Sequence, residues 1–225
     1  MNKATFKPVA ERALLVELGT VIDDEVNRRV IALDKAITDS GLAGVIELVP
    51  AMVNLLIVFD PLVTNHAELR IGVEHLLSSL QVGEEKGRNH ILDVCYEEAF
   101  APDLESVAET CGLSVEQVIE RHSQAQYRVS MFGFLPGYGY LSGVPDAIQV
   151  PRKENAIRDV RKGSVIIAGA QCIVMTFTMP AGWARIGHCE AQIITDDPDR
   201  PFLFDVGDTV SFRPISSSEM KCDTA

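Results

Sequence analysis

Phe132-Gly-Phe-Leu-Pro-Gly-Tyr-Gly-Tyr-Leu141 lies where the helical periodicity of the chain gives way to short β-rich runs. Glycine and proline make tight backbone turns, and here they alternate with flat aromatic side chains. Two later segments combine the same residue types, Gly163-Ser-Val-Ile-Ile-Ala-Gly-Ala-Gln171 and Pro180-Ala-Gly-Trp183. The three segments suit either the corners of a β-barrel or the walls of a pocket for a small planar ligand.

The remainder of this half of the chain predicts a barrel or a strongly curved sheet. Its β-rich runs, separated by glycine and proline turns, are Val165–Ala168, Ile173–Phe177, Ala191–Thr195 and Thr209–Phe212. Two short helices are expected before the β-rich region, one with an apolar face between Leu104 and Cys111 and one capped by Ser114. The serine-rich tail beyond Pro214 lacks periodicity and is expected to be disordered.

The first part of the chain has the order strand, helix, hairpin, helix. The helices are expected after Asp23 and Asn65, which can cap them, and each has an apolar stripe at helical spacing. The apolar runs that predict strands are Ala13–Leu18, Val45–Val49 and Asn54–Phe59. Ile91–Tyr96 could add the last strand of a ferredoxin-like α+β order.

The polar segment Gly83–Asn89 has the composition of a linker. We therefore predict a small α+β domain at residues 1–88 and a β-barrel domain at residues 89–225.

Composition narrows the classes of function. The formal charge of −12 argues against a general affinity for nucleic acid or anionic lipid. No apolar run approaches the roughly 20 residues of a membrane span, and Met1–Arg12 has no signal-peptide core, so a cytoplasmic location is expected. The five cysteines are odd in number and include no Cys-x-x-Cys pair, which favours free thiols over disulfides or a zinc site.

Basic residues concentrate in one segment of this acidic chain. Five of its 20 lysines and arginines lie between positions 152 and 162: Arg152, Lys153, Arg158, Arg161 and Lys162. Because guanidinium groups bind carboxylates and phosphates in a bidentate manner, Arg152 and Arg158 could hold an anionic substrate. A solvated loop without a ligand fits the same pattern.

His122 falls on the apolar face of its expected helix, shortly before the β-rich region. It could reach a pocket edge as an acid, base or hydrogen-bond donor, or it could be a satisfied core histidine. His188 is a weaker candidate. Asp103 is expected to cap the helix that begins at Leu104. The chain contains no Gly-x-x-x-x-Gly-Lys-Ser/Thr loop, so a conventional ATP-binding loop is absent.

Taken together, these motifs resemble the family of the B subunit of 5-oxoprolinase, also called allophanate hydrolase subunit 1, which includes the sporulation-kinase inhibitor protein. The resemblance covers nearly the whole chain. It rests on Val45–Pro50, Asp103-Leu-Glu, His122, Phe132–Leu141, Val150-Pro-Arg152, Gly163-Ser-Val, Ala168-Gly-Ala-Gln171, Gly182-Trp183 and Ile186-Gly187.

The resemblance implies a cyclophilin-like β-barrel following the small α+β domain. It also implies a partner, the C subunit of 5-oxoprolinase, with a related barrel, and a third subunit. In such a complex, ATP is the co-substrate for opening 5-oxoproline, a small amide, to glutamate. Arg152 and Arg158 would then offset phosphoryl charge, His122 would carry a proton, and the site would be lined by Phe134, Pro136, Tyr138, Gln171 and Trp183.

Three positions depart from the usual family pattern. Ala181 stands where members often have glycine, Ile157 precedes Arg158 where proline is usual, and Glu97–Asp103 looks more like the related carboxyltransferase part of urea carboxylase. Two alternatives stay open. One is a carboxyltransferase-type subunit acting with a biotin carrier on a urea-like substrate, and the other is a regulator that inhibits a sensor histidine kinase. Fold alone would also allow a proline isomerase.

Overall fold

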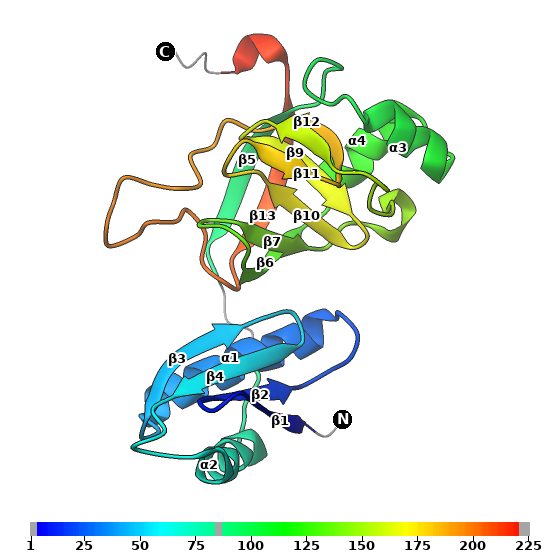
Figure 1. Ribbon diagram of the computed structural model, residues 1–225. Helices are drawn as coiled ribbons and strands as arrows, with labels where there is room; N and C mark the ends of the chain where they lie inside the picture. The colour runs from blue at the N-terminus through cyan, green and yellow to red at the C-terminus, as the bar shows by residue number, and fades with distance from the viewer. Residues whose placement is uncertain (1–3, 84–86, 221–225) are drawn as a thin grey trace. The chain divides into compact units, whose positions relative to one another are not determined.

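The computed structural model describes residues 4–83 and 87–220, and the chain divides into two compact units, Met1–Glu85 and Lys86–Ala225 (Figure 1). The division lies close to the boundary expected at residue 88. Each unit has its own hydrophobic core. Over the described ranges, we find no helix with the length and apolarity needed to cross a membrane.

Unit 1 is an antiparallel four-stranded sheet with two helices. Its sheet has the order β1-β2-β4-β3. The elements are β1 (Thr5–Val9), β2 (Ala13–Glu17), α1 (Asp24–Ser40), β3 (Val45–Pro50), β4 (Asn54–Phe59) and α2 (His66–Ser78). The Asp23 carboxylate accepts hydrogen bonds from the first-turn N–H groups of Glu25 and Val26, and Asn65 caps α2 in the same way. The predicted α+β unit is therefore confirmed.

The last strand of the ferredoxin-like order was wrongly assigned. The segment expected at Ile91–Tyr96 does form a strand, β5 (Asn89–Cys95). This strand pairs within unit 2 with β12 (Ala184–His188) and β13 (Thr209–Ile215). The outer strand that completes the sheet of unit 1 beside β2 is β1. Leu92, Val94 and Cys95 are buried in β5, and the first two belong to the core of unit 2. A local pattern shows that a strand is apolar, but it does not show which sheet buries it.

Unit 2 contains a closed barrel of seven strands, which confirms the predicted barrel (Figure 1). The strand order around the barrel is β10-β7-β6-β13-β5-β12-β9. Besides β5, the barrel strands are β6 (Tyr127–Phe132), β7 (Gly139–Ser142), β9 (Ser164–Ala168), β10 (Gln171–Val174), β12 (Ala184–His188) and β13 (Thr209–Ile215). A separate two-stranded ribbon pairs β8 (Ile157–Val160) with β11 (Met179–Ala181). The helices are α3 (Leu104–Cys111), α4 (Val115–Gln124), and the 3-10 turns η1 (Asp146–Ile148) and η2 (Ser217–Glu219).

Strand β9 lies between two apolar clusters, and the candidate site borders the outer one. All five of its residues are buried. Val165 and Ile167 point into the barrel core, whereas Ile166 and Ala168 belong to an outer cluster with Trp183. Successive side chains of a strand point to opposite faces, so the apolar run Val165–Ala168 is covered on both. The outer cluster also contains Val160 from β8 and Ala181 from β11.

Two further expectations in unit 2 were wrong. Within Ala191–Thr195 the structure has a single isolated bridge, from Ile194 to Phe202, in place of a strand. The segment after Pro214 is ordered as far as residue 220, because η2 forms there and the Ser217 N–H donates to the Glu97 carboxylate at 2.8 Å. The rest of the tail, residues 221–225, lies outside the described residues.

Candidate functional site

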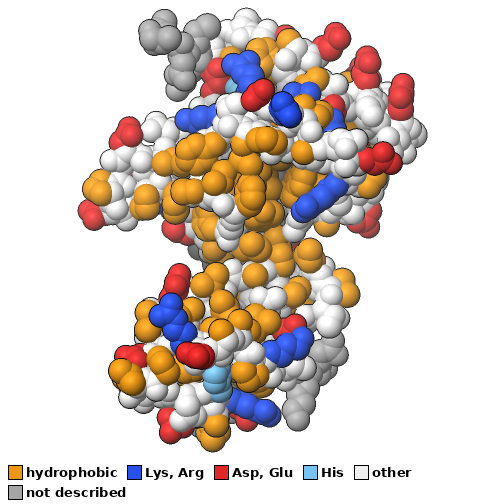
Figure 2. All heavy atoms as spheres, viewed as in Figure 1, with side chains coloured by type: hydrophobic (Ala, Val, Ile, Leu, Met, Phe, Trp, Pro, Cys, Tyr) orange, Lys and Arg blue, Asp and Glu red, His pale blue; other side chains and the backbone are white. Residues whose placement is uncertain are grey.

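A cavity of about 180 Å³ opens beside the outer cluster of unit 2. Its walls are mainly apolar and come from β7, β10, β11 and the loops around them. Figure 2 shows hydrophobic side chains gathered over the face of unit 2 that carries β7, β10 and β11. The lining residues are Phe134, Tyr138, Tyr140, Arg152, Ile173, Met179, Pro180, Ala181, Gly182 and Trp183. We call this space the aromatic cavity.

Four aromatic rings of the cavity contact one another in sequence. The ring centroids of Phe134 and Tyr138 are 5.8 Å apart, those of Tyr138 and Tyr140 are 5.8 Å apart, and those of Tyr140 and Trp183 are 6.2 Å apart. All three pairs are edge-to-face, an arrangement that aromatic quadrupoles favour. The rings therefore present a continuous apolar wall made largely by the segment Phe132–Leu141.

The charged member of the cavity is Arg152. Its guanidinium carbon lies 5.3 Å from the centroid of the Trp183 ring, within cation–π range. Arg152 is exposed, and over the described residues it forms no ion pair with a carboxylate. A guanidinium in this position keeps N–H donors available for an incoming anion.

Tyr138 contributes a neutral phenol to the same wall. Its hydroxyl lies 3.1 Å from the Met175 sulfur, to which it donates. Burial, followed by the neighbouring Tyr140, raises the pKa of Tyr138 to about 12, although Arg152 acts in the opposite direction. The phenol therefore stays protonated at neutral pH.

Phe134 lies at the cavity rim in an uncommon backbone conformation. Its φ of +73° is in the left-handed region, where a side chain larger than that of glycine is disfavoured. The side chain is 74% exposed although it is a large apolar group. Strain of this kind tends to occur at functional sites, where surrounding contacts impose it. Phe134 thus combines backbone strain with loss of apolar burial at the mouth of the cavity.

The structure brings together part of the set predicted from sequence. Phe134, Tyr138, Arg152 and Trp183 all line the aromatic cavity. Besides His122, the predicted residues that do not line it are Pro136, which is exposed on the loop, Gln171, which is half-buried at the start of β10, and Arg158, which is exposed on β8. Two other residues of β8, Ile157 and Val160, contribute to the outer cluster.

His122 lies in the barrel core and not at a pocket edge. The residue is fully buried, its Nδ1 is 2.7 Å from the Tyr96 hydroxyl, and its ring stacks on Phe212 with centroids 4.6 Å apart. Burial lowers the pKa of His122 to about 3. The expectation that its imidazole borders a pocket was therefore wrong, and the core alternative fits the geometry.

Asp103 also differs from its expected role. It occupies the N-cap position of α3, but its side chain makes no capping hydrogen bond. Its carboxylate instead accepts a hydrogen bond from the Arg185 N–H at 2.8 Å and pairs with the Lys153 ammonium at 2.6 Å. Sequence reasoning missed this role because both partners lie far along the chain.

The other lining residues were not among the predicted site residues: Tyr140, Ile173, Met179, Pro180, Ala181 and Gly182. Pro180, Ala181 and Gly182 stand in the segment Pro180–Trp183, which the sequence did single out. Tyr140 stands in the quoted aromatic segment, so that segment carried the signal for it. Ile173 and Met179 are ordinary apolar residues of β10 and β11, and nothing in their spacing distinguishes cavity walls from core.

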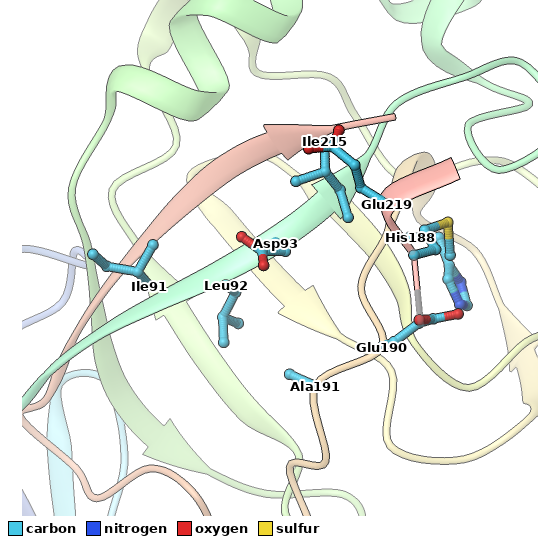
Figure 3. Close-up of a pocket in the computed structure, with 9 residues that line it drawn as sticks. Ile91, Leu92, Asp93, His188, Glu190, Ala191, Ile215 and Glu219 are labelled. Carbon is cyan, nitrogen blue, oxygen red and sulfur yellow. The ribbon is translucent and has the colours of Figure 1, made fainter. Parts of the chain in front are cut away.

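A second cavity, of about 200 Å³, lies beside β5, β12 and η2 (Figure 3). Asp93, His188, Glu190 and Glu219 contribute polar groups to it. Asp93 already pairs with Arg213, with Oδ1 to Nε at 2.6 Å, and Glu219 accepts from the Ser216 N–H. Across residues 4–83 and 87–220, no group of three or more histidine, cysteine or acidic side chains could hold a metal ion. Because the Asp93 and Glu219 carboxylates are already engaged, whereas Arg152 lies over Trp183 without a carboxylate partner among the described residues, we take the aromatic cavity as the candidate site.

Comparison with known proteins supports one family. A family model described as the carboxyltransferase domain, subdomain C and D, matches residues 4–204. The chain is 33% identical over 225 residues to the B subunit of 5-oxoprolinase from Bacillus subtilis, covering 95% of this chain and 94% of that protein.

Two solved structures extend the comparison. TTHA0988 matches with a TM-score of 0.79 at 30% identity, over 92% of this chain but 40% of its own, so this chain spans less than half of that protein. The K. lactis urea amidolyase matches with a TM-score of 0.80 at 19% identity, over 96% of this chain and 15% of its own, and this shows a shared fold alone. By its match to the family model and to the Bacillus subtilis relative, the chain belongs to the family of the 5-oxoprolinase B subunit.

Proposed function

We propose that this chain is a subunit of an ATP-dependent amidohydrolase complex of the 5-oxoprolinase type, and that its aromatic cavity binds a small lactam or urea-like amide. The observation that carries the proposal is the position of Arg152 over Trp183 at the edge of an aromatic wall. A relative that is named as the B subunit of 5-oxoprolinase, at 33% identity, supports it.

The chemistry of a lactam carboxylate matches this wall. A small flat ring can lie against aromatic faces, while a carboxylate binds a guanidinium through charge-assisted hydrogen bonds. In the cavity these two elements are adjacent, because Trp183 contacts both Tyr140 and Arg152. The arrangement would select a substrate that is planar at one end and anionic at the other.

The size of the cavity favours the amide over the nucleotide as its ligand. Its volume of about 180 Å³ is below the roughly 300–1,000 Å³ typical of pockets for drug-sized ligands. The chain also lacks a phosphate-binding loop of the conventional kind. We therefore assign ATP to the complex as a co-substrate, held mainly by a homologue of the C subunit or by a third subunit.

An unactivated amide resists attack by water, and ATP can supply the activation. Transfer of a phosphoryl group to the amide oxygen, addition of water to the carbonyl carbon and cleavage of the C–N bond would release ADP and phosphate and leave a carboxylate and an amine. Negative charge develops on the transferred group, and a fixed cation stabilises it. Arg152 is the charged residue that lines the cavity, and we assign to it either this role or that of holding the carboxylate of the substrate.

A second function is favoured by the family description. A carboxyltransferase-type subunit would take a carboxyl group from a biotin carrier and pass it to a urea-like substrate. The match to the carboxyltransferase subdomains C and D supports this alternative. The aromatic cavity could accept a small urea-like group in that reaction as well.

Reconstitution would test the proposal. The chain, a homologue of the C subunit and the third subunit would be purified and assayed for glutamate formed from 5-oxoproline with and without ATP. ATP-dependent glutamate that requires this chain, and that is lost in Arg152→Met, supports the proposal. No glutamate from the full set, together with carboxylation of urea by a carboxylated biotin carrier, would overturn it in favour of the alternative.

A further inference from the structure

We propose that Asp103 is a positioning residue that holds Arg152 against Trp183, so that one carboxylate sets the geometry of the aromatic cavity from outside it. Asp103 does not line the cavity. The relevance of this geometry to substrate rests on the proposed function, whereas the geometry itself can be tested on the isolated chain.

The two oxygens of Asp103 reach two different segments. Oδ1 lies 2.6 Å from the Lys153 ammonium. Oδ2 accepts a hydrogen bond from the Arg185 N–H at 2.8 Å, and the Asp103 N–H donates to the Arg185 carbonyl at 3.1 Å. The carboxylate therefore joins the segment of Lys153 to the start of β12.

These segments carry the two halves of the cation–π pair. Lys153 directly follows Arg152, and Arg185 comes two residues after Trp183. A further bond holds the same segments together, because the Lys153 N–H donates to the Gly182 carbonyl at 2.7 Å. Fixing Lys153 at both its backbone and its ammonium leaves the Arg152 backbone little freedom to move away from Trp183.

The charges of this tether are partly shielded from water. The side chains of Asp103, Lys153 and Arg185 are 14%, 27% and 24% exposed. Burial alone would raise the pKa of Asp103, but hydrogen bonds from Lys153 and the Arg185 backbone hold it below its usual value. Asp103 is therefore ionised at neutral pH, and its ion pairs are screened less than those of a fully exposed pair.

Such a tether matters because the Arg152 side chain is long and exposed. An arginine that is free to rotate loses conformational freedom when it binds a ligand, and this loss weakens affinity. Holding its backbone beside Trp183 reduces the loss before the ligand arrives. The expected consequence of breaking the tether is weaker binding, with the chemical step itself little affected.

Tryptophan fluorescence gives a direct readout, because Trp183 is the only tryptophan in the chain. The full-length chain would be compared with Asp103→Asn, Lys153→Met and Lys153→Arg by emission maximum and acrylamide quenching. Asp93→Asn is the control, since it breaks the ion pair of Asp93 with Arg213, which lies in the barrel but outside the aromatic cavity. Arg152→Met, alone and combined with each tether variant, completes a double-mutant cycle.

We expect Asp103→Asn and Lys153→Met to shift the emission and raise quenching, Lys153→Arg to restore the native signal, and Asp93→Asn to leave it unchanged. In the Arg152→Met background, the tether variants should add little. In the reconstituted complex, Lys153→Met should raise KM roughly tenfold, equivalent to about 1.4 kcal/mol, with kcat little changed.

Two outcomes would overturn the proposal. One is native Trp183 fluorescence in folded Lys153→Met and Asp103→Asn. The other is an effect of the tether variants that is as large without Arg152 as with it, which would indicate a general structural role. If Asp103→Asn does not fold, the fluorescence of Lys153→Met tests the proposal by itself. This variant breaks the same ion pair at its more exposed partner, where a substitution disturbs the fold less. Failure of the complex to turn over 5-oxoproline would count against the proposed function but not against this result.

Discussion

The guanidinium carbon of Arg152 lies 5.3 Å from the centroid of Trp183, so the charged side chain of the aromatic cavity rests on the ring of its tryptophan. Arg158, the other arginine singled out in the sequence, is exposed on β8 and does not line the cavity. The two arginines lie six positions apart and face different surroundings. We therefore expect Arg152 to contribute to ligand binding and Arg158 to contribute little.

We predict that Arg152→Met weakens binding of 5-oxoproline by about 10- to 100-fold, because a charge-assisted pair with the substrate is lost. Arg158→Met should change it less than about twofold, as expected for a surface charge. Titration calorimetry or Trp183 fluorescence would measure both affinities. Equal losses in the two variants would show that the segment acts through its overall charge.

Phe134→Gly should lower the affinity for substrate while leaving the free energy of unfolding nearly unchanged. Glycine adopts the φ of +73° without strain, so the free energy of unfolding should stay within about 1 kcal/mol of the wild type. Substrate affinity should nevertheless fall, because the aromatic rim is gone. Urea unfolding and ligand titration would be compared with Phe177→Ala, which removes an exposed aromatic side chain outside the cavity. A large loss of stability in Phe134→Gly would mean that the ring supports the fold.

The sequence predicted those parts of the fold that depend on local signals. Asp23 and Asn65 cap α1 and α2 because a side-chain oxygen before an apolar stripe satisfies free N–H groups within the same few residues. The apolar run Val165–Ala168 likewise predicts a strand, and β9 forms there. Pairing partners are different, because β5 pairs with β13 more than a hundred residues away and neither segment encodes that choice.

The same contrast between local signals and long-range contacts applies to the residues of the candidate site. Phe134, Tyr138 and Trp183 were predictable because aromatic residues among glycines and prolines are typical of a cavity wall. For His122 the sequence left a core position and a pocket edge both open, because the apolar face of α4 fits either. The neighbours that place it in the core, Tyr96 and Phe212, come from distant parts of the chain. Asp103 was predicted to cap α3 because its actual partners, Lys153 and Arg185, also lie far along the chain.

Gly163→Ala should be much more damaging than Gly169→Ala, although both glycines have positive φ, +83° and +53°. A Cβ at Gly163 would lie 2.5 Å from the Cys189 carbonyl oxygen, whereas a Cβ at Gly169 would meet nothing within 4 Å. We expect a loss of roughly 1 kcal/mol at Gly169 from backbone strain alone and about 2 kcal/mol more at Gly163. Urea unfolding would measure the difference. Equal losses would mean that the backbone around Cys189 moves aside freely.

His122 should make the stability of unit 2 depend on pH between 5 and 7. Burial lowers its pKa from an ordinary 6.5 to about 3, so the folded chain keeps the imidazole neutral while the unfolded chain protonates it below about pH 6.5. The unfolded state then binds more protons, and stability falls as the pH drops. From pH 7 to pH 5 this group should remove about 2 kcal/mol from the free energy of unfolding. His122→Gln should be less stable at pH 7 but should lose less on acidification, whereas an unchanged slope in urea unfolding at the two pH values would show that His122 is hydrated or already charged in the folded barrel.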